Sequence, residues 1–336
     1  MQYVHLSPRT TESFEQSSRP HIMPRLRVLR LSVTDLCNFR CRYCMPATGV
    51  PKISHRDLMP LERLASMVRW LTLHAGIDRV RLTGGEPLVR QGVDRLIAIL
   101  SSFSGIREIS LTTNASLLES QALSLKAAGL KRVNISLDSL DKDAFAQITR
   151  GGNLERTLAG IEAAVAAGLT PIKLNTVLQR SSWKYEVPRL LDYAATKGFE
   201  VRFIELMQTG TERAWCESEY ISVDEVCSLL GAKVTAVKDQ SHVPARSTLL
   251  NWHGKLVNVG WIAPRSHPFC SHCERLRMDA QGRLRRCLMD PTMFDLPRTL
   301  ETLNDTAAEW EFQSYIAGKV PPLSMNSSFA MSQIGG

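Results

Sequence analysis

The sequence contains no apolar run long enough to cross a membrane as a helix. Residues 1–20 are polar, include Glu12 and Glu15, and lack the apolar centre of a secretory signal. Acidic residues are also unusual in transit peptides, so we interpret residues 1–25 as a disordered arm. The chain also lacks any known nucleic-acid-binding motif and any basic stripe interleaved with aromatic residues. These absences argue against a membrane or nucleic-acid partner.

The composition is ordinary for a soluble globular protein, with 44% hydrophobic and 22% charged residues. A length of 336 residues allows two domains or one large α/β barrel. The formal charge is +8, from 41 basic and 33 acidic residues. Basic residues that stand singly at predicted strand ends suit a phosphorylated small substrate, although a solvated basic surface accounts for most of the 41.

A fourth cysteine is missing beside each of two cysteine triplets. In the first triplet, Cys37, Cys41 and Cys44 are spaced so that their thiolates can converge on one small inorganic centre. Clusters that only transfer electrons are normally held by four cysteines. Three thiolates on a four-iron cluster would leave one iron open to bind and activate a small molecule. Thiolates that must remain available for metal need a reducing compartment, which predicts a cytoplasmic protein.

The second triplet consists of Cys270, Cys273 and Cys287. His272 lies between the first two cysteines and could complete a tetrahedral zinc site of three sulfurs and one nitrogen. An open iron–sulfur cluster uses the three cysteines alone. The residues by themselves therefore leave zinc and an iron–sulfur cluster as alternatives here.

Short β-branched runs alternate with longer helical patterns from Arg25 to Leu206, which predicts a parallel sheet. Right-handed crossovers would curl it into an incomplete (β/α)6 barrel of the TIM type, with its chemistry at the carboxyl ends of the strands. We expect this partial barrel over residues 26–230 and a smaller α+β cluster-binding region over residues 231–336, including a helix at Arg298–Ala317. The predicted strands are Leu26–Val33, Arg79–Thr83, Glu108–Thr112, Arg132–Leu137, Pro171–Leu178 and Glu200–Leu206. The predicted helices between them are Leu61–His74, Val93–Ser101, Ser116–Ala128, Leu154–Ala167 and Val187–Lys197.

The first cysteine run, with Tyr43 before its last cysteine, resembles the radical S-adenosylmethionine superfamily. The second predicted strand ends in Thr83-Gly84-Gly85-Glu86-Pro87, which is similar to that superfamily's Gly-Gly-Glu-Pro element. Glycines there would let the backbone approach a ligand closely, and the carboxylate could hold an ammonium group. Such a turn is common by itself, but its position directly after the next strand makes the resemblance specific.

Within the superfamily, the chain resembles the GTP 3',8-cyclase family, also called molybdenum cofactor biosynthesis protein A. The features are the second open cysteine triplet, the arginines after its second cysteine, and the terminal Gly335-Gly336. The resemblance extends from Arg30 to the last residue. One departure is Ala115, where the family commonly has glycine after Thr-Thr-Asn. If this residue needs a positive φ, alanine is strained there, unless Asn114 adopts the conformation instead.

The resemblance implies two [4Fe-4S] clusters and S-adenosyl-L-methionine as cofactors. The first cluster would cleave S-adenosylmethionine to a 5'-deoxyadenosyl radical, which abstracts the C3' hydrogen of GTP. The C3' radical then attacks C8 of guanine, whose base is held by the second cluster. The product would be (8S)-3',8-cyclo-7,8-dihydroguanosine 5'-triphosphate, formed in the first step of molybdopterin biosynthesis. Cofactors of this kind carry the radical chemistry, and the protein positions the reacting atoms.

The resemblance also assigns S-adenosylmethionine contacts to several strand-end residues. A serine at a strand end more commonly caps a helix, and a methionine after an apolar strand is commonly core, so these assignments depend on the family. The implied contacts are Tyr43, Gly84, Gly85, Glu86, Ser136 and Met207.

The GTP contacts that the resemblance implies are mostly cationic. Arginine's planar fork suits phosphate oxygens, and alternate residues on one strand share a face, so Arg79 and Arg81 can act together. Single arginines could equally form surface salt bridges. The implied substrate residues are Arg30, Arg79, Arg81, Thr112, Lys173, Arg202, Arg275, Leu276 and Arg277.

Gly335 and Gly336 would enter the active site and assist radical formation, as the resemblance implies, although a terminal Gly-Gly is commonly a floppy end. The implied partners are GTP, an electron donor such as flavodoxin or ferredoxin, and cyclic pyranopterin monophosphate synthase as the next enzyme. A homodimer is compatible with the resemblance. Two alternatives remain: another radical S-adenosylmethionine enzyme with an auxiliary cluster, and a non-enzymatic iron–sulfur or zinc sensor.

Overall fold

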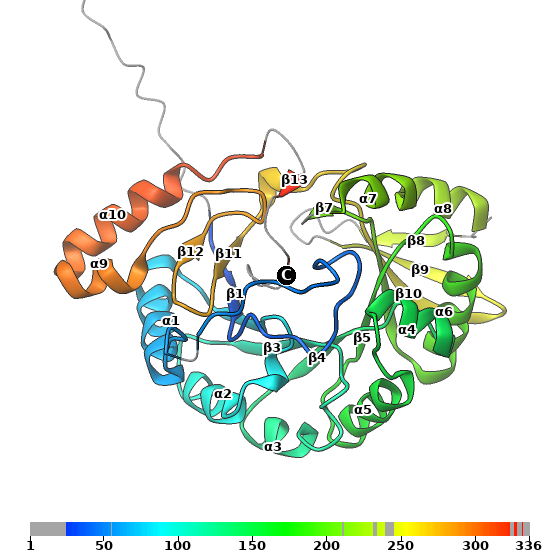
Figure 1. Cartoon of the computed structure of the whole chain (residues 1–336), viewed down its shortest axis with the longest axis horizontal. Coiled ribbons are helices and arrows are strands. Elements are labelled where there is room, and N and C mark those ends of the chain that lie inside the picture. Colours follow the sequence, from blue (N-terminus) through cyan, green and yellow to red (C-terminus); the bar gives the residue numbers. More distant parts are fainter. Residues whose placement is uncertain are drawn as a thin grey trace, which may run out of the picture.

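The computed structural model describes residues 25–54, 56–209, 212–230, 234–238, 245–322, 326–327 and 331. Within these ranges, one curved 11-stranded sheet forms the wall of an open barrel, and helices cover its outer face (Figure 1). Six neighbouring strands run parallel in chain order at its centre, which confirms the predicted incomplete barrel. They are β1 (Val28–Ser32), β2 (Arg79–Thr83), β3 (Glu108–Thr113), β4 (Arg132–Ser136), β5 (Lys173–Val177) and β6 (Glu200–Ile204).

The C-terminal part of the chain extends this sheet at both edges. Strand β10 (Lys255–Ile262) pairs parallel with β6, and β11 (Arg275–Met278) pairs parallel with β1. Beyond them lie the antiparallel strands β9 (Arg246–Trp252), β8 (Val234–Lys238) and β12 (Leu284–Arg285). A separate two-stranded sheet joins β7 (Gln208–Thr209) to β13 (Asn326–Ser327). The domain boundary at residues 230 and 231 stays a prediction.

The outer helices pack against the sheet through a continuous apolar core. They are α1 (Leu61–Ala75), α2 (Val93–Ser101), α3 (Ala122–Ala127), α4 (Lys142–Thr149), α5 (Leu154–Ala166) and α6 (Trp183–Lys197), followed by α8 (Val223–Leu230), α9 (Leu296–Thr302) and α10 (Asp305–Ala317). The short helix α7 (Arg213–Glu219) lies beside β7. None of the helices in the described ranges is long and apolar enough to span a bilayer.

Each central strand buries alternate residues against these helices. Leu29, Leu82 and Phe203 are among these core residues, all with no exposed surface. The residues between them face the inside of the barrel, here called the lumen, and many are charged. Parallel strands covered on both faces normally read as continuous apolar runs. The polar alternation therefore indicates a lumen built for a ligand.

Three predicted helices differ from the observed ones. The predicted helix Arg298–Ala317 is wrong, because the chain breaks at Leu303 and Asn304 caps α10 by accepting from the backbone N–H of Ala307. Helix α3 begins six residues later than predicted, after a series of turns that follows Ala115. Helix α6 begins at Trp183 and contains Pro188 within it, whereas the prediction began beside that proline.

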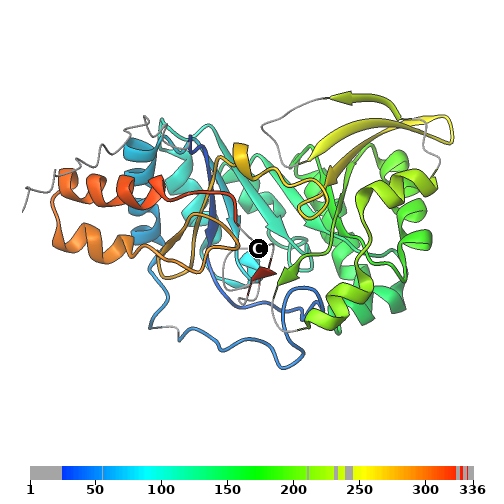
Figure 2. The same cartoon turned by 90° about the horizontal axis from the view of Figure 1, so that it is seen from above.

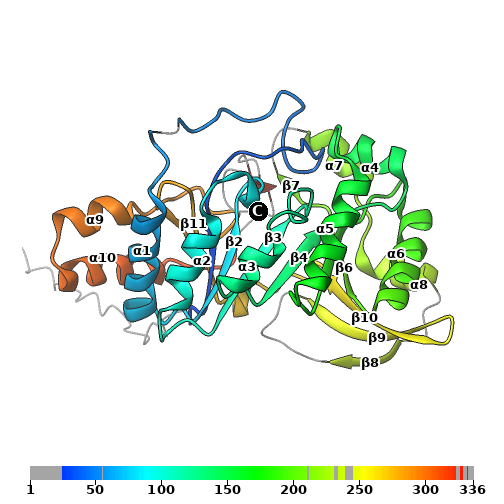
Figure 3. The same cartoon turned by 90° about the horizontal axis from the view of Figure 1, so that it is seen from below.

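The carboxyl ends of the central strands lie at one end of the barrel. The segment after β1, which carries the first cysteine triplet, runs along this end, and the β8–β9 extension lies on the opposite side (Figures 2 and 3). This end is where a barrel of this type places its chemistry.

Candidate functional site

The first cysteine triplet occupies one tight loop between β1 and α1. The backbone N–H groups of Cys44 and Met45 both donate to the carbonyl of Cys41, at 2.9 and 3.1 Å. The N–H of Phe39 donates to Sγ of Cys37 at 3.4 Å. Backbone donors aimed at cysteine sulfur are a feature of iron–sulfur sites. The loop therefore fits a cluster held by three thiolates.

Burial favours the protonated thiols of Cys37 and Cys41. It raises the pKa of Cys37 to about 11. It also raises the pKa of Cys41 well above its ordinary value, and the neighbouring Asp138, Cys44 and Cys37 raise it further. Iron must displace these protons, so cluster binding is coupled to proton release.

The C-terminal end of α4 fixes the outer side of the cysteine loop. Arg40 N–H donates to Thr149 O at 2.9 Å, and Arg42 N–H donates to Ile148 O at 3.1 Å. In return, the Arg150 guanidinium donates to Met45 O at 3.1 Å. The loop thus uses carbonyls that a helix end would otherwise leave unpaired.

The Gly-Gly-Glu-Pro turn fixes the inner side of the same loop. Gly85 N–H donates to Thr34 O and Glu86 N–H donates to Leu36 O, both at 2.8 Å. A Cβ on Gly85 would lie 2.2 Å from Leu36 O, closer than real Cβ contacts come. Glycine is therefore required for this turn to lie against the segment that leads into Cys37.

The carboxylate of Glu86 is buried and bonded to its own chain. It accepts from Thr113 Oγ1 at 2.7 Å, Asn114 N at 2.7 Å and Leu88 N at 3.1 Å. Burial raises the pKa of Glu86 to about 7, and these three donors oppose the rise. In the structure, Glu86 connects the turn after β2 to the end of β3. Its contact with an ammonium group stays a prediction.

Asn38 ties the cysteine loop to the end of β3. Its Oδ1 accepts from Asn114 Nδ2 at 2.9 Å, and its Nδ2 donates to Ser116 Oγ at 2.8 Å. Between them, Ala115 has a φ of 61° and no exposed surface. Ala115, which stands where the family commonly has glycine, is therefore the residue with positive φ, and Asn114 is not.

The remaining predicted S-adenosylmethionine residues lie around this loop. Tyr43 donates its hydroxyl to Asp138 Oδ2 at 2.7 Å, and burial raises the pKa of Asp138 to about 6. Ser136 is the last residue of β4 on the lumen face, and Met207 lies in the short link between β6 and β7. Together with the glycine turn, they occupy the carboxyl ends of β1, β2, β4 and β6.

Arginines stand side by side on the lumen face below this loop. Arg30 of β1 is paired in register with Arg81 of β2 on one side and Arg277 of β11 on the other. Burial lowers the pKa of Arg81 to about 9 and of Arg277 to about 10, and adjacent arginines add to the effect. Arg81 Nε is also buried with no hydrogen-bond partner among the described residues. Burying adjacent like charges is unfavourable, so this wall is suited to a polyanion.

Lys173 and Arg202 continue the cationic wall on β5 and β6. Both bond Glu200, with Lys173 Nζ at 2.7 Å from Oε2 and Arg202 Nε at 2.6 Å from Oε1. One carboxylate thus orients two cations toward the lumen. Thr112 and Arg132 share this face through the strand register.

Three predicted substrate residues occupy different environments. Arg79 lies at the amino end of β2, with 43% of its side chain exposed and its Nε 3.9 Å from Asp78. Arg275 lies over the ring of Phe269 at 5.0 Å, beside the second triplet. Leu276 has no exposed surface and packs in the core, so it can reach a ligand only through its backbone.

The second triplet is assembled from two segments. Cys270 and Cys273 precede β11, whereas Cys287 follows β12 and receives the N–H of Met289 on Sγ at 3.5 Å. Burial raises the pKa of Cys273, but Arg275 and Lys319 outweigh it and bring the value to about 7. In the described part of the chain, no three His, Cys, Asp or Glu side chains converge to hold one metal ion.

Met331, the last described residue, contacts the first triplet. Met331 N–H donates to Cys44 O at 3.1 Å, and β13 pairs with β7 immediately after Met207. Gly335 and Gly336 lie outside the described residues.

Sequence reasoning missed two lumen groups. Asn175 of β5 lies in register between Ser136 and Arg202, and Thr83 ends β2. Asn175 Oδ1 and Thr83 Oγ1 are both buried without a hydrogen-bond partner among the described residues. The alternation of polar and apolar residues along the strands was the available signal in the sequence. Only the strand register shows which polar residues lie next to one another in the lumen.

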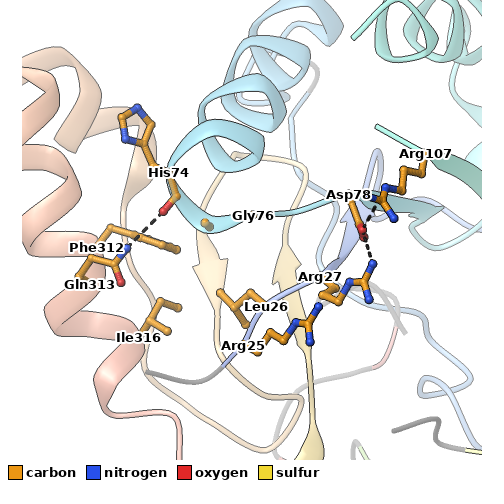
Figure 4. A pocket seen from close by; sticks show the side chains of 11 residues that line it. Arg25, Leu26, Arg27, His74, Gly76, Asp78, Arg107, Phe312, Gln313 and Ile316 are labelled. Carbon is orange, nitrogen blue, oxygen red and sulfur yellow. Dashed lines mark hydrogen bonds and ion pairs between the residues drawn. The ribbon is translucent and has the colours of Figure 1, made fainter. Parts of the chain in front are cut away.

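A cavity of about 510 Å³ lies at the amino ends of β1 and β2, opposite the cysteine loop (Figure 4). Arg27 and Arg107 both approach Asp78 there, and Gln313 donates to His74 O at 3.2 Å. Arg27, Arg107 and Asp78 thus pair with one another. The cavity is separate from the site, because the cysteine loop lies at the other end of the strands.

Comparison with known proteins gives two matching families. The Radical SAM superfamily matches residues 31–185, and Molybdenum Cofactor Synthesis C matches residues 199–321. The chain is 42% identical over 319 residues to a GTP 3',8-cyclase of Moorella thermoacetica, covering 93% of this chain and 98% of that protein. It is 45% identical over 283 residues to a GTP 3',8-cyclase of Peptoclostridium acidaminophilum, covering 84% and 86% respectively.

Among solved structures, Streptococcus suis SuiB bound to S-adenosylmethionine aligns with a TM-score of 0.63 at 14% identity. The alignment covers 86% of this chain and 67% of SuiB, and supports the shared fold. The sequence identity and coverage show more: the chain belongs to the GTP 3',8-cyclase family of radical S-adenosylmethionine enzymes.

Proposed function

We propose that this chain converts GTP to (8S)-3',8-cyclo-7,8-dihydroguanosine 5'-triphosphate, the first step of molybdenum cofactor biosynthesis. The observation that carries the proposal is the row Arg277, Arg30 and Arg81 across β11, β1 and β2. A triphosphate would offset the repulsion among these half-buried and buried cations. Lys173 and Arg202, already oriented by Glu200, would bind further phosphate oxygens.

Two [4Fe-4S] clusters would be held by the two cysteine triplets. When bound with S-adenosylmethionine, the first would supply a 5'-deoxyadenosyl radical for hydrogen abstraction. Tyr43, Gly84, Gly85, Ser136 and Met207 would position S-adenosylmethionine against the cysteine loop. Thr112 and the backbone at Leu276 would complete the GTP site, and Arg79 and Arg275 would extend its charge.

The C-terminal Gly335 and Gly336 would complete the reaction site. The bond from Met331 N–H to Cys44 O supports this, because it brings the tail to the first triplet only a few residues before these glycines. A flavodoxin or ferredoxin would supply electrons, and cyclic pyranopterin monophosphate synthase would take the product. We further propose a cytoplasmic location and a homodimer.

The test is an anaerobic assay with GTP, S-adenosylmethionine and a strong reductant, with products identified by mass. Iron and sulfide are counted on the same reconstituted protein. Two clusters per chain and a product of the mass of cyclised GTP support the proposal. Cleavage of S-adenosylmethionine without GTP consumption would favour another radical enzyme of the superfamily. Zinc in the second site, or no cleavage with both clusters loaded, would refute the cyclase.

A further inference from the structure

The second cysteine triplet has a third structural component, the segment that follows α10. Lys319 lies two residues beyond the last residue of that helix and is half-buried. Its Nζ donates to Sγ of Cys273 at 3.6 Å and also to the backbone carbonyl of Arg286, the residue before Cys287. One ammonium group therefore contacts both of the segments that carry the triplet.

The surrounding contacts hold Lys319 in this position. The guanidinium of Arg286 donates to Tyr315 O at 3.0 Å and to Asp290 Oδ2 at 2.7 Å. A Cβ on Gly318 would lie 2.0 Å from Nη1 of Arg286, so a side chain there would displace the guanidinium. The end of α10 therefore packs closely against Arg286, and the flexible end of that side chain would have to shift for a larger residue at position 318.

The first triplet needs no such bridge, because its three cysteines share one continuous loop. The second triplet is interrupted by β11, β12 and the turn between them. Strands β11 and β12 and the contacts of Arg286 with Tyr315 position the two segments, and Lys319 adds a contact that joins them directly through its side chain. An ammonium group beside a thiolate also stabilises the sulfur charge.

We propose that Lys319 is a positioning residue of the second cluster site. Lys319 joins the two segments that carry the cysteines and places a positive charge against the sulfur of Cys273. The inference rests on the proposed function, since it assumes that the second triplet holds an iron–sulfur cluster. A donor to a cluster sulfur favours the reduced state and therefore raises the reduction potential.

The test uses full-length protein in which Cys37, Cys41 and Cys44 are all replaced by Ala, so that only the second cluster assembles. In this background, Lys319→Met, Lys319→Arg and the exposed control Lys184→Met are reconstituted anaerobically. Iron content, the rate of iron loss to a chelator and the reduction potential are measured. We expect Lys319→Met to lose iron about tenfold faster and to have a lower potential, Lys319→Arg to recover part of both, and Lys184→Met to match the background.

Gly318→Ala tests the same bridge while keeping the charge, and should also speed iron loss. Thermal unfolding of each metal-free variant shows whether the fold is retained. If Lys319→Met does not fold, iron loss and potential are compared in Gly318→Ala and Lys319→Arg instead. Unchanged iron loss and potential in Lys319→Met, or in both other variants, would overturn the role of Lys319. If the background protein itself binds zinc or no iron, the proposed function fails before any Lys319 variant is compared.

Discussion

Cys37, Cys41 and Cys44 lie in one loop between β1 and α1, whereas Cys270, Cys273 and Cys287 come from segments on either side of β11 and β12. The first loop is held by backbone bonds to α4 and to the glycine turn, and burial, which outweighs the nearby Arg40, raises the pKa of Cys37. The second triplet depends on side-chain cations, with Arg275 and Lys319 around Cys273. The difference suggests that the first site is fixed by the backbone and the second by charge and tertiary contact.

Replacing one cysteine in each triplet is expected to separate the two roles most strongly. Cys44→Ala should abolish release of 5'-deoxyadenosine and therefore all product, because the first cluster loses a ligand. Cys273→Ala should abolish cyclised product but leave slow S-adenosylmethionine cleavage. Mass spectrometry of both products measures this, and equal loss of cleavage in the two variants would break the comparison.

Because Glu86 is buried beside the first cysteine loop, the free energy of unfolding should depend on pH through the titration of its carboxyl group. Its folded pKa is raised to about 7, so its stabilising contribution is complete below about pH 4.5 and is lost as pH rises through about 7, by about 3 kcal/mol. The free energies of unfolding of metal-free wild type and Glu86→Gln are compared in urea from pH 5 to 8. The advantage of wild type over the variant should shrink as pH rises; parallel profiles would show that Glu86 does not titrate in this range.

Arg277 should affect GTP binding without affecting the first site. Removing one charge-assisted contact to phosphate costs about 2 kcal/mol, or roughly 30-fold in affinity. GTP affinity is measured by equilibrium binding for Arg277→Ala, with the exposed Arg298→Ala on α9 as control. Cleavage of S-adenosylmethionine should remain near wild type. Unchanged GTP affinity would show that Arg277 does not bind the triphosphate.

The smallest effect concerns the backbone that supports the first site. Ala115 has a φ of 61°, which costs an L-residue about 1–2 kcal/mol, while its buried methyl returns about 0.8 kcal/mol. Ala115→Gly should therefore raise the free energy of unfolding by about 0.5 kcal/mol, measured in urea. A loss of stability instead would mean that methyl packing outweighs backbone strain at this position.

Much of the architecture could be predicted because its signals are local. Six strands and several helices follow from runs of apolar residues, and Leu61 and Val93 begin helices as expected. The helix boundaries at Leu303 and Ala122 were missed, since a capping asparagine and a series of turns override helical propensity there. The engagement of Glu86 with Thr113 was also missed, because it joins two strand ends.

The amino-acid sequence alone determined that two sets of three cysteines exist and that charged residues alternate with apolar ones along the strands. These are properties of spacing, which the chain carries before it folds. The tertiary structure decided that β11 lies beside β1, which places Arg277 next to Arg30, and that Lys319 meets Cys273. Such contacts join residues far apart in the chain, so they depend on strand order and helix docking, and no local pattern encodes them.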